Sequence, residues 1–118
     1  MPLHDRDVRM IRDCGANFIR QGHSAVDPAV MDACDRYGVF IADASADCEV
    51  GWNSRQTDDP KRWFELKQEF TRDIVIRDRN RPAVLLWEIG NGMLSEEDAG
   101  KLAAIIREWD PLGGRGIT

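Results

Sequence analysis

The chain has few cysteines, and none of them is placed for a metal site. Three cysteines in 118 residues are an odd number, and no two are close enough in sequence to form a ligand pair. We interpret Cys14, Cys34 and Cys48 as small core residues or free thiols, which favours a reducing compartment. Residues 1–5 contain no apolar segment of the signal-peptide kind, but a leader lost by truncation leaves secretion open. The compartment is therefore undecided between the cytoplasm and a secreted or periplasmic location.

Long apolar runs, a basic excess and phosphate-binding loops are also missing. No apolar run reaches the length of a membrane span. The net charge of −5, from 16 basic and 21 acidic residues, argues against nucleic acid or an anionic membrane as a partner. Neither glycine-rich phosphate-binding motif, GxGxxG or GxxxxGK[ST], occurs, which disfavours nucleotide binding. An apolar share of 42% and a charged share of 31% remain ordinary for one soluble globular domain.

Helical and extended patterns alternate along the chain. The spacing of apolar residues, the Asp-Pro starts and the glycine or proline stops predict helices over 5–14, 27–38, 59–80 and 95–110. In the third of these we expect Trp63, Leu66, Phe70 and Ile74 to form the apolar stripe. Short apolar segments over 17–20, 39–43 and 83–88 predict strands buried on both faces. Strict alternation predicts an α/β fold of parallel βα units.

Polar residues gather where each predicted strand ends. In both barrels and doubly wound sheets, active groups lie at the carboxyl ends of the strands, so the two architectures stay open at this point. The candidate residues at these ends are Arg20 and His23, Asp43 and Asp47, and Glu88 and Asn91.

Three separated blocks of the sequence resemble one enzyme family. They are DVRMIRDCGANFIRQGH over residues 7–23, CDRYGV over 34–39 and RDRNRPAVLLW over 77–87. In this order and spacing they resemble glycoside hydrolases of family 2, which include β-galactosidases, β-glucuronidases and β-mannosidases. The resemblance implies a (β/α)8 TIM barrel that acts on a carbohydrate, and it implies no cofactor. A whole barrel needs about 250 residues. We therefore expect residues 1–118 to be a fragment covering the second to fourth strands, with a fifth strand beginning at 116–117.

The resemblance also places the catalytic groups, and one of them is missing. Retaining glycosidases use two carboxylates about 5 Å apart, one as acid/base and one as nucleophile. The family acid/base Glu directly follows an Asn that matches Asn91, but here that position is Gly92. The nucleophile belongs to a seventh strand, outside this chain. Asn91 would hydrogen-bond a substrate hydroxyl, as the matching residue does in the family.

Glu88 is the candidate that could replace the missing acid/base. Strand alternation puts it on the same face as Gly92, but four residues earlier, about 13 Å away along a strand. The alternative is a structural carboxylate held inside by Arg20 or by another arginine. Arg20 matches a family Arg near the nucleophile, and its own alternative role is to neutralise Asp43 or Glu88.

The remaining candidates are predicted to bind substrate, each with a structural alternative. His23 matches a family His, although the Tyr and Pro that follow it in the family are absent, and a loop His often only completes a hydrogen-bond network. Asp43 matches the acidic residue that closes the third barrel strand, but the Glu after it is Ala44, so we predict no metal there. Trp52 could stack on a sugar or anchor its loop. Trp87 would fill the barrel and form the floor of the site.

Three interpretations follow from these residues. The first is part of a glycosidase barrel, inactive alone because half of the carboxylate pair is absent. The second is a carbohydrate-binding or structural relative that has lost its acid/base, favoured by Gly92. The third is an unrelated flavodoxin-like domain with a reversal in strand order. A partial barrel also leaves open sheet edges and uncovered apolar faces, so we predict a homo-oligomer formed through those edges.

Overall fold

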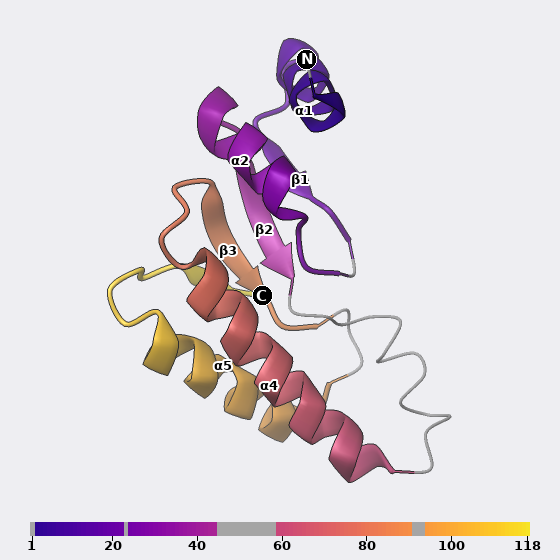
Figure 1. Ribbon diagram of the computed structural model, residues 1–118. Coiled ribbons are helices and arrows are strands. Elements are labelled where there is room, and N and C mark those ends of the chain that lie inside the picture. Colours follow the sequence, from indigo (N-terminus) through magenta and orange to yellow (C-terminus); the bar gives the residue numbers. More distant parts are fainter. Residues whose placement is uncertain (1, 23, 45–58, 91–93) are drawn as a thin grey trace.

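A computed structural model describes residues 2–22, 24–44, 59–90 and 94–118. Strands and helices alternate along these residues, as predicted (Figure 1). The helices are α1 (Leu3–Asp13), α2 (Pro28–Tyr37), α4 (Pro60–Asp78) and α5 (Glu96–Trp109). The strands are β1 (Phe18–Arg20), β2 (Phe40–Ala44), β3 (Val84–Glu88) and β4 (Gly116–Ile117).

The starts of α2 and α4 are fixed by aspartate side-chain caps that the sequence predicted. The Asp27 carboxylate accepts a hydrogen bond from the Ala29 amide at 2.7 Å, and Pro28 follows at the first helical position. Asp59 caps α4 in the same way, accepting from the Arg62 amide at 2.9 Å. Gly38 ends α2 with a φ of 69°, a left-handed conformation that glycine adopts without strain.

The four described strands form one parallel sheet in the order β1-β2-β3-β4. A doubly wound sheet would reverse its strand order at a switch point, and no reversal occurs among these strands. Consecutive parallel neighbours with right-handed crossovers put their helices on one face, as the staves of a barrel do. The chain is therefore an α/β fold, part of a TIM barrel, and the flavodoxin-like interpretation is wrong.

The two faces of the sheet differ sharply. On one face, Arg20 pairs in register with Ala42, and Ala42 with Leu86. We call this the inner face, because it corresponds to the inside of a closed barrel. The opposite face carries Ile41 and Trp87, which belong to a core shared with the helices. Helices α4 and α5 lie side by side on that outer face (Figure 1).

The apolar stripe predicted for α4 is partly wrong. Ile74 is buried, but Leu66 and Phe70 are 38% and 53% exposed. The buried face of the helix instead runs through Lys67, Thr71, Ile74, Val75 and Asp78. Most of these side chains are polar and are accommodated locally; the Thr71 hydroxyl, for example, donates to the Lys67 carbonyl at 2.8 Å. Apolar spacing alone therefore gave the wrong phase for this helix.

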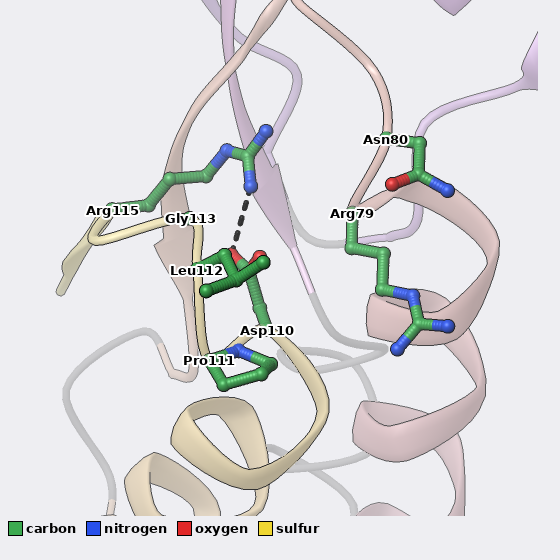
Figure 2. Close-up of a pocket in the computed structure, with 7 residues that line it drawn as sticks. All are labelled: Arg79, Asn80, Asp110, Pro111, Leu112, Gly113 and Arg115. Carbon is green, nitrogen blue, oxygen red and sulfur yellow. Dashed lines mark hydrogen bonds and ion pairs between the residues drawn. The ribbon is translucent and has the colours of Figure 1, made fainter.

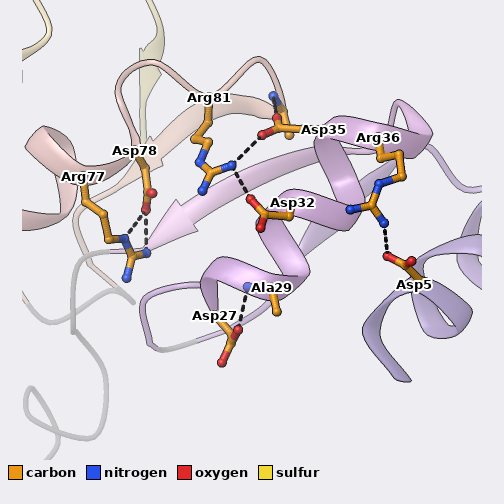
Figure 3. A network of polar contacts seen from close by, with 10 residues as sticks. Asp5, Asp27, Ala29, Asp32, Asp35, Arg36, Arg77, Asp78 and Arg81 are labelled. Atoms are coloured by element: carbon orange, nitrogen blue, oxygen red, sulfur yellow. Dashed lines mark hydrogen bonds and ion pairs between the residues drawn. The ribbon is translucent and has the colours of Figure 1, made fainter. Parts of the chain in front are cut away.

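Residues 77–82, the RDRNRP block, form a junction between elements. Arg77 donates to Asp78 and to the Val26 carbonyl, and Arg79 donates to the Trp109 carbonyl at the end of α5. Arg81 forms ion pairs with Asp32 and Asp35 of α2 (Figure 3). The three arginines thus connect the end of α4 to three other parts of the fold.

Candidate functional site

Two predicted site residues meet at the carboxyl end of the inner face. Arg20 is the last residue of β1 and Glu88 the last residue of β3. Arg20 Nε donates to Glu88 Oε2 at 3.0 Å, and Arg20 Nη2 donates to Oε1 of the same carboxylate. Glu88 is only 4% exposed, whereas the Arg20 side chain is 44% exposed. The two side chains therefore form a bidentate ion pair, in which the carboxylate is buried and the guanidinium is partly exposed to solvent.

Two alanines on β2 make room for this contact. Strand β2 lies between β1 and β3, which sit two strand spacings apart, roughly 9.5 Å. Ala42 pairs with Arg20 and with Leu86, and Ala44 pairs with Glu88. A larger side chain at either position would fill the space in which the guanidinium and the carboxylate meet. Sequence reasoning missed these alanines, although strand alternation puts both on the face of Arg20.

The ion pair borders an open hollow of about 480 Å³ on the inner face. It is lined by residues of β1, β2 and β3, and by one residue that follows β3 and one that follows β4. They are Phe18, Arg20, Ala42, Leu86, Glu88, Gly90 and Thr118. A hollow with one exposed guanidinium and an apolar floor suits a polar ligand with an apolar side, as a sugar has.

Asp43 and Trp87 lie elsewhere, which corrects the prediction that they line the same site. The two residues pair in register with each other, one position out of phase with Ala42 and Leu86. Because side chains alternate along a strand, both point to the outer face, towards the helices. Asp43 there accepts a hydrogen bond from the Val26 amide at 3.3 Å and is fully buried.

Trp87 has a structural role at the end of α5, where it contacts Asp110. Its indole Nε1 donates to Asp110 Oδ2 at 2.9 Å, and the Arg115 guanidinium lies 5.8 Å from its ring centre. Arg115 also pairs with Asp110, as Figure 2 shows beside the hollow of about 340 Å³ that these residues line with Arg79. Trp87 thus ties β3 to the end of α5 and forms no floor for the ion-pair site.

The other candidates lie outside the described residues. His23, Trp52 and Asn91 belong to this group, as do Gly92 and Asp47. The predicted contacts of His23, Trp52 and Asn91 with substrate stay predictions.

The described part of the chain offers no group of three or more His, Cys, Asp or Glu side chains positioned around a metal ion. Of the helices it contains, none has the length and apolar character needed to cross a bilayer.

Comparison with known proteins assigns the chain to a family. Residues 1–115 match the family model described as "Glycosyl hydrolases family 2, TIM barrel domain". The chain belongs to glycoside hydrolase family 2. Among curated relatives, a β-glucuronidase of Formosa agariphila is 31% identical over 96% of this chain, and the β-galactosidase BoGH2A of Bacteroides ovatus is 34% identical over 78%. In each case the chain spans 11% of the relative's length.

Solved structures of the family share the fold. A family 2 β-glucuronidase superposes with a TM-score of 0.81 at 28% identity, covering 98% of this chain and 11% of that one. A β-glycosidase from Bacteroides vulgatus superposes with a TM-score of 0.78 at 27% identity, covering 99% and 15%. The family 2 resemblance and the partial TIM barrel predicted from the sequence are confirmed.

Proposed function

We propose that this chain is part of the catalytic barrel of an enzyme that hydrolyses O-glycosidic bonds in carbohydrates. The observation that carries the proposal is the Arg20–Glu88 pair at the carboxyl edge of the inner face, where TIM-barrel enzymes hold their substrates. Family membership supports the reaction class, because curated relatives are named β-glucuronidase and β-galactosidase.

In this proposal Arg20 contacts the substrate and Glu88 positions Arg20. A general acid must deliver a proton, but both Glu88 oxygens already accept hydrogen bonds from Arg20. The contacts thus favour the ion-pair alternative for Glu88 over the acid/base role. The exposed part of the Arg20 guanidinium faces the hollow, where its N–H groups suit a sugar hydroxyl or a carboxylate.

The 118 residues alone are proposed to be inactive. The position of the family acid/base is Gly92, and the nucleophile strand lies outside the sequence. Two correctly placed carboxylates are needed for hydrolysis by the family mechanism.

The test uses a complete barrel. These 118 residues replace the matched segment of the F. agariphila relative, and hydrolysis of activated aryl β-glycosides is followed with and without azide. We expect slow hydrolysis that azide accelerates, because azide does not need general-base help at the second step. Gly92→Glu should raise hydrolysis without azide by about 10²-fold or more. Glu88→Gln is the matched variant: if it alone abolished the azide-independent reaction while leaving sugar binding intact, Glu88 would be the acid/base.

A second candidate function is carbohydrate binding without catalysis, which Gly92 favours. It predicts that the same hybrid binds the sugar but turns over no activated glycoside, with azide or without. Activity of the Gly92→Glu variant does not distinguish the two, so the azide experiment on the unchanged sequence decides between them.

We also propose that the chain self-associates. Strands β1 and β4 end the described sheet on either side and leave backbone groups unpaired at its edges. Phe18 and Phe40 add exposed apolar surface on the inner face. A second copy would cover both features.

A further inference from the structure

Two buried carboxyl groups meet behind β2, on the outer face of the sheet. Asp43 is 0% exposed and Asp78 is 1% exposed. Asp43 Oδ1 accepts from the Val26 amide, and Asp78 Oδ2 accepts from Arg77 Nε at 2.8 Å. The other oxygen of each group, Asp43 Oδ2 and Asp78 Oδ1, is buried without a hydrogen-bond donor. The two carboxyl groups share neighbours: the Val26 amide donates to Asp43, and Arg77 Nη2 donates both to the Val26 carbonyl and to Asp78 Oδ2.

Two carboxylates cannot both be stable here in the charged form. Each unpaired oxygen lacks a donor, and a buried oxygen without one destabilises the fold, more strongly when it is charged. Two carboxylates and the Arg77 guanidinium together carry a charge of −1. One proton between the carboxyl groups would both neutralise this cluster and give the unpaired oxygens a hydrogen bond. A cation such as Ca²⁺ would need six or more oxygens, and among the described residues no group of three or more His, Cys, Asp or Glu side chains is placed to hold a metal ion.

We propose that Asp43 and Asp78 share one proton, and that this proton fastens α4 to β2 and to the segment leading into α2. Three parts of the chain meet at the pair. Asp43 belongs to β2, Asp78 ends α4, and Val26 precedes α2 and is fully buried. Arg77 adds a second connection by donating to the Val26 carbonyl at 2.8 Å (Figure 3 shows its contact with Asp78). The shared proton is thus the central contact of this corner of the fold.

The electrostatics agree with the geometry. Burial, together with the neighbouring Asp78 carboxyl, raises the pKa of Asp43 to about 7, against the smaller opposing effects of the Val26 amide and Arg77. Among the described residues, the Arg81 guanidinium also acts on this cluster, because it repels Arg77. Arg20 and Glu88 lie on the opposite face of the sheet.

The raised pKa of Asp43 makes the folded state less stable as the pH rises. The folded state keeps a proton that the unfolded state releases near the ordinary pKa of 3.8. Stability from the pair is therefore complete below about pH 4 and is lost as the pH rises towards about 7.

The test compares the pH dependence of unfolding in the full chain and in three variants. Urea unfolding is measured from pH 4.5 to 8.5. In the unchanged chain we expect the unfolding constant to rise with pH, by up to tenfold per unit, because one proton is released. Asp43→Asn supplies a permanent N–H donor to Asp78, so its unfolding constant should lack this rise, and Asp78→Asn should behave alike. Asp13→Asn, at an exposed position on α1, is the matched control and should keep the rise.

A second measurement needs only the unchanged chain, so it tests the proposal even if the variants fail to fold. Carbon-13 NMR of the side-chain carboxyl groups in the unchanged chain should show the Asp43 carboxyl titrating near pH 7. An Asp43 titration below pH 5, or equal pH slopes for the unchanged chain and Asp43→Asn, would overturn the proposal. The difference between chains removes the contribution of the two histidines, which are common to all of them.

Discussion

At the scale of single residues, the ion pair between Arg20 and Glu88 joins two residues that the sequence predicted for the site. Arg20 and Glu88 are 68 positions apart, and both were candidates because they end predicted strands. Their contact favours the ion-pair alternative for Glu88, because both oxygens of its carboxylate accept N–H groups of one guanidinium. The same contact makes Arg20 dependent on Glu88 for its orientation.

Removing only the guanidinium should destabilise the fold. Arg20→Met leaves the buried Glu88 carboxylate without its main counter-charge, and we expect a loss of about 1–2 kcal/mol, less than for a fully buried pair because Arg20 is partly solvated. Urea unfolding at pH 7 measures it. The double variant Arg20→Met/Glu88→Met should recover most of the loss, and a double variant no better than the single one would contradict this account.

The cysteines should differ strongly in reactivity. Cys34 is fully buried, and burial, with the nearby Asp35 charge, raises the pKa of its thiol to about 11. Thiolate at pH 8 is then about 100-fold scarcer than for an ordinary thiol, and access is lower as well. Iodoacetamide at pH 8, followed by peptide mass spectrometry, should label the exposed Cys14 rapidly and Cys34 only after unfolding. Equal labelling in the native chain would show that α2 opens readily.

At the scale of elements, Asp35 of α2 connects this helix to the segment that leads into β3. The Asp35 carboxylate on α2 accepts both from the Ala83 amide at 2.8 Å and from Arg81. It thereby fixes the start of β3 against α2. The neighbouring Asp32 also pairs with Arg81, but its side chain is 53% exposed.

These two aspartates provide a matched comparison. Asp35→Ala removes the acceptor of the buried Ala83 amide and should cost about 1–2 kcal/mol of stability. Asp32→Ala removes only a solvated ion pair and should cost about 0.5 kcal/mol or less. Thermal unfolding of both variants checks the order, and a larger loss for Asp32→Ala would mean that Arg81, and not the backbone contact, holds this junction.

At the scale of the whole molecule, the exposed inner face of the sheet is the feature that bears on the proposed self-association. Phe18 and Phe40 pair in register and are 39% and 42% exposed on the inner face. Two neighbouring exposed rings form an apolar patch of the kind that a second copy would cover in the proposed self-association.

Association should therefore depend on these two rings. We expect light scattering after size exclusion to show a mass above 13.4 kDa at micromolar concentration. Phe18→Ser/Phe40→Ser should shift the chain towards monomer without lowering the urea midpoint, because the rings lie outside the buried core. The exposed Leu112→Ser variant serves as a control and should leave the mass unchanged. A monomer at all concentrations would contradict the proposed self-association.

Most of the fold was predictable from local signals, and part of the site was not. The Asp-Pro caps, the glycine stops and the short apolar segments are local, so the helices and strands lie where the sequence placed them. The face of α4 was mispredicted, because Lys67 and Thr71 are buried although polar, and a search for apolar spacing does not include polar residues. Asp43 and Trp87 were placed at the right end of the sheet but on the wrong face.

The sequence by itself determined the alternation of elements, the parallel sheet and the family, because each follows from spacing and motif along the chain. Only the tertiary structure decided which strand-end residues meet. Side-chain direction reverses at every residue of a strand, so one step in phase separates Arg20 and Glu88 on the inner face from Asp43 and Trp87 on the outer face. Strand phase and register across the sheet are set by packing between distant segments, which a local pattern does not contain.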